Sequence, residues 1–315
     1  MFDTLKNELE GCFYTVFTPF DKNYYIDFEG IEKYINYLYN GGARKFYVMA
    51  YNSRYSQLNE SEILELNTFC IKKIKSLNNK NIVIVGDPIH CSTETSLNFS
   101  LKAKEDGADL ISLIVREKFF DDNQILEHYN YIGEKSKFPI LVHEMPFLSG
   151  MNGKQMNWPL SLIKKLKSVP YIVALKEDAK DYEMTKEILK LEPDIKVIIA
   201  GKKKNLLNFK QHGAKAYLNG ISIIDARIGE LFWRSWNNND KKLLDEIILK
   251  LEDPFFETVV KKYGWHRCNK SILEAAGFFS RRERMPMPEI NYEQYQEVVD
   301  CYNQINNNLK LFFND

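Results

Sequence analysis

The sequence YIVALKED, residues 171–178, carries the signal on which the fold prediction rests. It is an unbroken apolar, β-branched run that ends in a lysine. A run of this kind is typical of a strand covered on both faces, as in a parallel sheet. Successive side chains of a strand point to opposite faces. Lys176 is therefore predicted to share the inner face with Ala174 and Ile172, whereas Val173 is predicted to point outward.

Seven more segments have the same character, and together the eight runs follow one another at intervals of roughly 20 to 35 residues. The eight runs are residues 12–18, 45–50, 81–86, 109–115, 138–144, 171–176, 196–201 and 215–220. Segments of helical period fill the gaps between them. This alternation predicts an α/β fold, a (β/α)8 TIM barrel.

Helix boundaries support the same interpretation. Asn59 with Glu62 resembles a capping box, Ser92 is suited to cap the next helix, and Gly107 and Gly213 stand where helices end. An open doubly wound sheet that binds a nucleotide is the rival fold, but the glycine-rich phosphate turn it would carry is missing from the sequence.

The last third of the chain changes to an all-helical pattern, with helices predicted at about 223–236, 240–262, 266–277 and 292–313. We therefore predict two parts: a barrel over residues 1–222, and a C-terminal helical extension over residues 223–315 that packs on it.

Bulk properties narrow the functional class. Basic and acidic residues balance at 43 each, which gives no reason to expect nucleic acid or an anionic membrane as partner. No apolar run approaches the ~20 residues that span a bilayer, and the N-terminal segment lacks the pattern of a secretion signal. Five scattered cysteines fit reduced thiols better than a disulfide framework or a zinc site. We expect a cytoplasmic protein without a metal.

Lys176 is the first candidate catalytic residue. At the C-terminal mouth of a barrel, where barrel enzymes hold their chemistry, an amine among apolar neighbours has a pKa below its usual ~10.4. The neutral amine can attack a ketone to form a Schiff base. The alternative is a lysine that merely ends a strand and extends to water.

Several segments then resemble, in order and spacing, the dihydrodipicolinate synthase / N-acetylneuraminate lyase family of class I aldolases. They are TVFTPF (15–20), LNESE (58–62), GADLISLI (107–114), IVALKED (172–178), GAK (213–215), and Lys270 with GFFSRRERMPMP (277–288). The resemblance covers roughly residues 10–300. It implies a barrel, no metal or organic cofactor, and a homotetramer or homodimer.

The motifs that bind substrate in this family are altered. Its G-T-T-G-E loop, which holds the carboxylate of a 2-oxo acid, falls on residues 50–54, so that Tyr51, Asn52 and Ser53 are the predicted carboxylate-binding residues and Arg54 replaces the acid. The family's proton-shuttling tyrosine falls on His143, which we interpret as the acid/base.

Further site residues follow from the same comparison. Glu144, beside His143, is predicted to bind substrate. The family's P-Y-Y segment falls on residues 118–120, which contain no tyrosine. Gly201 and Asn219, at the ends of the seventh and eighth strands, are predicted to bind substrate. The remaining alternative for His143 is a spacer without a catalytic role.

The family's G-D-D segment reads Gly201-Lys202-Lys203, and with Arg54 and Arg116 these lysines form a candidate anion-binding mouth. The alternative is that the lysine run is simply solvated.

Three functional hypotheses follow. The first is a lyase that forms a Schiff base between Lys176 and a 2-oxo acid or keto sugar acid and then breaks or forms a C–C bond. The second is a hydro-lyase, a sugar-acid dehydratase that uses the same imine. The third is an altered barrel that only binds a metabolite or a partner protein. Three changes argue against dihydrodipicolinate synthase activity itself: the tyrosines of the P-Y-Y proton relay are missing, the threonine pair is replaced, and Leu148 stands where dihydrodipicolinate synthases place an arginine.

Overall fold

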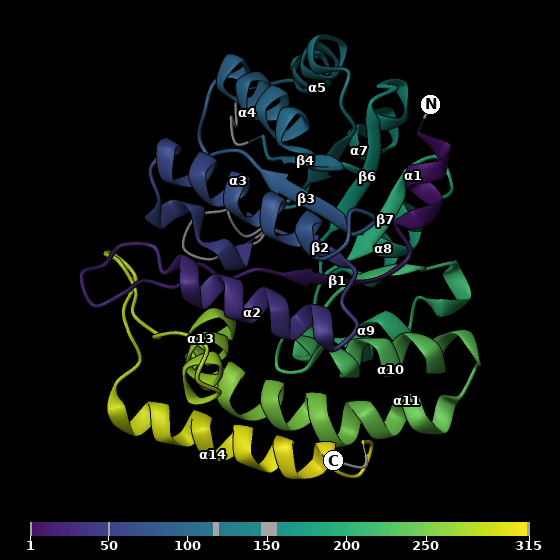
Figure 1. Ribbon diagram of the computed structural model, residues 1–315. Coiled ribbons are helices and arrows are strands. Elements are labelled where there is room, and N and C mark those ends of the chain that lie inside the picture. The colour runs from purple at the N-terminus through teal and green to yellow at the C-terminus, as the bar shows by residue number, and fades with distance from the viewer. Residues whose placement is uncertain (1, 50, 116–119, 146–155, 314–315) are drawn as a thin grey trace.

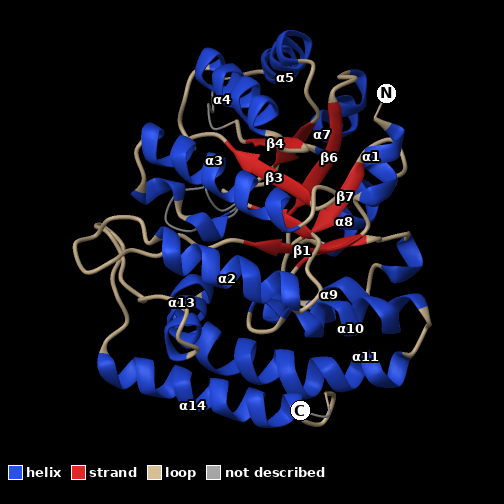
Figure 2. Cartoon of the chain, viewed as in Figure 1, coloured by secondary structure: helices blue, strands red, loops and turns tan. Residues whose placement is uncertain are grey.

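The computed structural model describes residues 2–49, 51–115, 120–145 and 156–313. Within them, parallel strands form one closed barrel in which each strand pairs with the next along the chain and β8 pairs with β1 (Figures 1 and 2). The strands are β1 (Gly11–Thr15), β2 (Lys45–Tyr47), β3 (Ile82–Gly86), β4 (Leu110–Leu113), β5 (Ile140–His143), β6 (Ile172–Glu177), β7 (Lys196–Ile199) and β8 (Ala216–Leu218). The predicted TIM barrel is confirmed, and each predicted run overlaps one strand.

Helices surround the barrel and cover its outer face (Figure 2). In the N-terminal two thirds they are α1 (Asp3–Glu8), α2 (Phe28–Asn40), α3 (Glu60–Leu77), α4 (Thr93–Asp106), α5 (Asp122–Ser136), α7 (Leu160–Lys165), α8 (Tyr182–Leu189) and α9 (Lys203–Leu207). The C-terminal helices are α10 (Ala226–Asn237), α11 (Lys241–Ile247), α12 (Lys261–Tyr263), α13 (Trp265–Ala275) and α14 (Tyr292–Leu309).

The helix ends follow the capping chemistry that the sequence predicts. Asn59 and Glu62 form a complete capping box at the start of α3, and the Ser92 side chain accepts the backbone N–H of Thr95 at the start of α4. Gly107 ends α4 with φ 93°, a left-handed conformation that glycine adopts without the steric cost of a Cβ.

Each predicted C-terminal helix is present. The second is continuous from residue 241 to 263 but includes two π-helical segments, Ile248–Glu252 and Phe255–Val260. Helix α10 packs on the barrel, and the hydroxyl of Tyr14 in β1 donates a hydrogen bond to the Ala226 carbonyl of this helix at 2.9 Å. The division at residue 222 stays a prediction.

A small apolar cluster fills the barrel interior, and a larger one lies between the strands and the helices. Ala174 faces the interior as predicted. The expectation for the preceding residues was wrong, because Val173 lies in the inner cluster and Ile172 in the outer one. In the pairing of β5 with β6, Ile140 lies opposite Ile172 but Leu141 lies opposite Ala174. This register shift is a β-bulge, and it breaks the alternation of inward and outward side chains at Val173.

No helix among the described residues combines the length and apolarity needed to cross a bilayer.

Candidate active site at the mouth of the barrel

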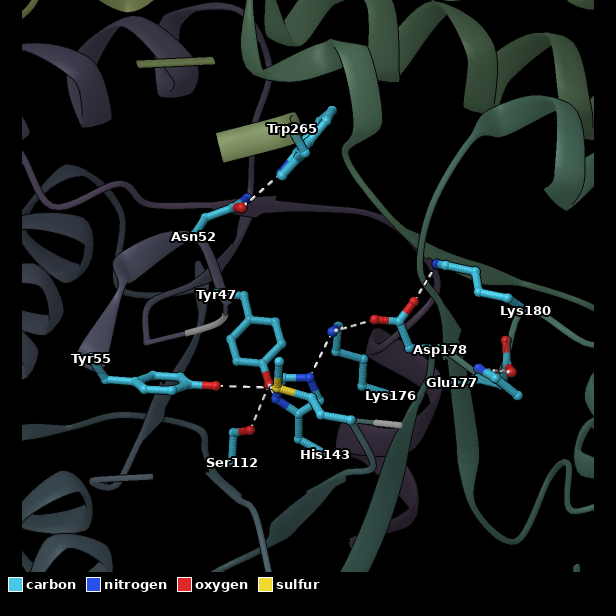
Figure 3. Close-up of polar contacts among 12 residues, drawn as sticks. Tyr47, Asn52, Tyr55, Ser112, His143, Lys176, Glu177, Asp178, Lys180 and Trp265 are labelled. Carbon is cyan, nitrogen blue, oxygen red and sulfur yellow. Dashed lines mark hydrogen bonds and ion pairs between the residues drawn. The ribbon is translucent and has the colours of Figure 1, made fainter. Parts of the chain in front are cut away.

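Lys176 and His143 meet at the C-terminal ends of two neighbouring strands. They are paired in the register of β6 and β5, and Lys176 Nζ lies 2.6 Å from His143 Nε2 (Figure 3). Both residues are at least 98 % buried. The strands therefore bring the two predicted catalytic side chains together, with a nitrogen base within hydrogen-bond distance of the amine.

The Lys176 amine also has an acidic neighbour. Asp178 Oδ2 lies 3.4 Å from Nζ, and the other carboxylate oxygen of Asp178 pairs with Lys180 (Figure 3). Burial lowers the pKa of Lys176, and the Asp178 carboxylate opposes this shift. Lys180 has a φ of 56°, which is uncommon for a residue other than glycine.

The second ring nitrogen of His143 faces a phenol from across the barrel. Tyr47 Oη lies 3.3 Å from His143 Nδ1 and 2.5 Å from Ser112 Oγ (Figure 3). Tyr47 is fully buried, and burial raises the pKa of its hydroxyl, so the phenol is neutral. Sequence analysis did not single out either residue. The alternation of side chains along β2 could have indicated Tyr47, because Phe46 faces the helices and Tyr47 faces the barrel interior.

Glu144 follows His143 and is also buried. Its carboxylate oxygen accepts the backbone N–H of Trp158 at 3.2 Å. Burial raises the pKa of Glu144 to about 8, and the Glu177 and Asp178 carboxylates add to this increase whereas Lys176 opposes it. At neutral pH the carboxyl is therefore mainly protonated and can donate a hydrogen bond.

The loop after β2 is held by hydrogen bonds to the protein. Asn52 donates to Thr15 Oγ1 at 2.5 Å and accepts from the Trp265 indole at 2.7 Å (Figure 3). The Ser53 hydroxyl donates to the Val16 carbonyl at 2.6 Å and accepts the Met49 N–H at 2.9 Å. The polar side-chain atoms expected to bind a carboxylate thus already have partners from β1 and α13. The side chain of Tyr51 lies outside the described residues.

Asn219, after β8, offers a different donor. Its Oδ1 lies 3.4 Å from Thr15 Oγ1, whereas its buried Nδ2 has no hydrogen-bond partner among the described residues. Gly201 has φ 107°, and a Cβ at this position would lie 3.2 Å from Lys180 Nζ. Both residues lie on the rim formed by the ends of β7 and β8.

The lysine run after β7 has carboxylate partners from the C-terminal helices. Lys202 pairs with Glu257, and Lys204 pairs with Asp253 at 3.4 Å. Lys203 is buried, with Nζ donating to the Asn219 carbonyl at 2.7 Å. These contacts neutralise most of the charge that suggested an anion-binding mouth.

Of the two arginines predicted to bind an anion, the structure describes Arg54. Arg54 is partly buried, with φ 50°, and its charge lowers the pKa of His266 and Lys270 in α13. It therefore lies toward the C-terminal helices. Arg116 lies outside the described residues.

A cavity of about 410 Å³ lies beside the ends of β3 and β4, lined among others by His90, Cys91 and His128. Lys176 does not line it. The Lys176 side chain is only 3 % exposed, so Nζ is closed to bulk solvent. In the described part of the chain no group of three or more His, Cys, Asp or Glu side chains is arranged to hold a metal ion.

A sequence profile of the Dihydrodipicolinate synthetase family matches residues 8–305. The chain belongs to this family. Members of the Dihydrodipicolinate synthetase family are class I aldolase-type lyases that bind small keto acids, and they are usually oligomeric. The expected family membership is thereby confirmed.

The relatives within the Dihydrodipicolinate synthetase family are distant. A 4-hydroxy-tetrahydrodipicolinate synthase from Staphylococcus epidermidis is 22 % identical and spans 94 % of this chain and 96 % of its own. The crystal structure of dihydrodipicolinate synthase from Bacillus clausii has a TM-score of 0.82 at 20 % identity, covering 95 % of this chain and 98 % of that one. The N-acetylneuraminate lyase from Fusobacterium nucleatum has a TM-score of 0.82 at 17 % identity, covering 94 % and 99 %. Identities this low make the chain a divergent member.

Proposed function

We propose that the protein is a Schiff-base lyase in which Lys176 condenses with the ketone of a 2-oxo acid or keto sugar acid. The observation that carries the proposal is the 2.6 Å contact between Lys176 Nζ and His143 Nε2 in a buried site. Burial favours the neutral amine, and an adjacent base is what an amine nucleophile requires.

The reaction begins with attack of the neutral Lys176 amine on the ketone carbon. The resulting carbinolamine loses water to give a protonated imine, and His143 carries protons between the nitrogen and the departing hydroxyl. In the cleavage direction a base takes the proton of the hydroxyl on the neighbouring carbon, and that carbon becomes the carbonyl of the departing fragment. The electron pair of the broken C–C bond passes to the imine, which becomes an enamine. Protonation of the enamine and hydrolysis of the imine release the product and restore the amine.

Glu144 favours a second candidate, elimination of water from a sugar acid through the same imine. A hydroxyl leaves a carbon far more easily once it is protonated, and Glu144 is a buried carboxyl whose pKa of about 8 keeps it in the acid form at neutral pH. Product analysis distinguishes the two reactions. A lyase releases pyruvate or a comparable fragment, whereas a hydro-lyase keeps the carbon skeleton intact.

The hydrogen bonds that hold the substrate form a further part of the proposal. Because the polar atoms of Asn52 and Ser53 already bond within the protein, we assign the hydrogen bonds to the substrate to the O–H of the protonated Glu144 carboxyl and to Asn219 Nδ2, which has no hydrogen-bond partner among the described residues. We further propose that the enzyme is a cytoplasmic homo-oligomer, a tetramer or dimer. Five free cysteines fit a reducing compartment.

Borohydride reduction tests the proposal directly. The protein is incubated with pyruvate or a panel of keto sugar acids and reduced, and adducts are mapped by mass spectrometry. We expect an adduct on Lys176 that is lost in Lys176→Met. Lys180→Met is the matched control, because Lys180 is a more exposed amine close by and its loss should leave the adduct in place. Absence of any Lys176 adduct across the panel would instead support a barrel that only binds a metabolite or partner.

A further inference from the structure

We propose that Tyr47 and Ser112 are positioning residues that form an internal proton relay with His143. This inference rests on the proposed function, because it concerns the protons that His143 exchanges with Lys176 or its imine. The tyrosines of the P-Y-Y segment are missing from residues 118–120, and phenol and hydroxyl groups are instead supplied from inside the barrel.

The relay is built from three strands. Tyr47 ends β2, Ser112 lies in β4 and His143 ends β5. The Oη atom of Tyr47 lies between Ser112 Oγ, at 2.5 Å, and His143 Nδ1, at 3.3 Å. All three side chains are at least 98 % buried, so bulk water does not compete for these hydrogen bonds.

The contacts define two arrangements of the same protons. A protonated Lys176 can only donate, so His143 Nε2 accepts, Nδ1–H donates to Tyr47, and Tyr47 donates to Ser112. A neutral Lys176 can also accept a hydrogen bond, and this allows the reversed order: Ser112 donates to Tyr47, Tyr47 donates to Nδ1, and the histidine proton sits on Nε2. Tyr47 therefore supports whichever tautomer the state of Lys176 requires.

This dual role separates Tyr47 from a residue that only packs. A phenol both donates and accepts, whereas phenylalanine would leave Nδ1 facing an apolar ring. Without Tyr47, the hydrogen bond between the phenol and His143 Nδ1 is lost in a site closed to bulk water. Proton exchange with Lys176 then becomes unfavourable in one direction. The titratable groups that act on this hydrogen-bond network from the surrounding elements are Lys176, Asp178, Lys180, Glu144, Asp87 and Tyr55.

The first readout needs no substrate. In ¹⁵N-labelled protein, long-range ¹H–¹⁵N spectra report which imidazole nitrogen carries the proton, and His143→Gln assigns the signals. We expect Tyr47→Phe to change the His143 nitrogen shifts and their pH dependence. Tyr34→Phe is the control, because Tyr34 is an equally buried phenol that bonds the Ile223 carbonyl instead. Unchanged His143 shifts in Tyr47→Phe would overturn the proposal.

The second readout is kinetic. Tyr47→Phe should still give the borohydride adduct on Lys176 but should reduce turnover about tenfold or more. It should also alter the pH–rate profile. Ser112→Ala should cause a smaller loss that Ser112→Thr, which keeps a hydroxyl, largely restores. A normal rate and profile in Tyr47→Phe would overturn the relay, whereas absence of a Lys176 adduct in the unmodified protein would overturn the proposed function and leave the NMR test standing.

Discussion

At the scale of single residues, Glu144 gives the clearest link between burial and pH. Burial raises its pKa from 4.5 to about 8, so the folded state holds a proton that the unfolded state has released above pH 4.5. The free energy of unfolding must therefore fall as pH rises from about 4.5 to about 8, and change no further above that range on account of this group.

Glu144→Gln removes this dependence because the amide does not ionise. We expect the variant to exceed the unmodified protein in free energy of unfolding at pH 8 by on the order of 3 kcal/mol, with little difference at pH 4.5. Urea titrations at the two pH values measure it. Glu105→Gln on the exposed surface of α4 is the control, and an equal effect of both substitutions at both pH values would contradict the burial argument.

The residue scale also shows what the sequence reveals and what it hides. Lys176 and His143 were predictable because each ends an apolar run, and consecutive strands are neighbours in a parallel barrel. Tyr47 was not, because it reaches His143 across the barrel from a strand that does not pair with β5. Which side chains meet across the interior depends on the relative tilt and stagger of all eight strands.

At the scale of elements, the start of α9 depends on a residue far along the chain. The preceding residue, Lys202, makes no side-chain cap, and instead Glu252 accepts the backbone N–H groups of Lys203 and Lys204 at 2.8 and 2.9 Å. Glu252 lies in a π-helical segment of the C-terminal extension and is fully buried. Its carboxyl group also lies close to the buried Lys203 amine.

Removing this carboxylate should destabilise the fold strongly. We expect Glu252→Ala to lower the free energy of unfolding by about 3 kcal/mol, because it leaves two backbone N–H groups without their acceptor and removes the carboxyl group beside the buried Lys203 amine. Glu252→Gln should cost less, since the amide oxygen can still accept one N–H. Guanidinium denaturation measures both, and a loss in Glu252→Ala no larger than in an exposed Glu105→Ala would refute the assignment.

The contacts of the lysine run are an example of what the sequence does not reveal. Three consecutive lysines at the mouth of a barrel are basic only if nothing neutralises them. Their partners Glu252, Asp253 and Glu257 lie about 50 residues later, on a helix whose position against the barrel the sequence does not specify.

At the scale of the whole molecule, the extension and the barrel share one apolar core. The outer cluster contains residues of the strands and barrel helices together with Val298 and Ile305 of α14. In Figure 1, α11, α13 and α14 lie along one side of the barrel next to α10. The eight strands and four C-terminal helical stretches were predictable from apolar periodicity, which reflects burial, but how the helices divide between barrel and extension depends on packing.

A chain shortened to residues 1–237 tests whether the barrel is autonomous. It keeps α10 but loses Glu252, which caps α9, and Trp265, which holds Asn52 in the loop after β2. It also exposes the apolar surface that α14 covers. We expect this chain to lack a cooperative thermal transition in near-ultraviolet circular dichroism and to give no borohydride adduct on Lys176. Removal of residues 1–7, which carry no fully buried side chain among those described, is the control and should keep the transition. A sharp transition in the 1–237 chain would mean that the barrel folds without the extension, which would then serve the site loop alone.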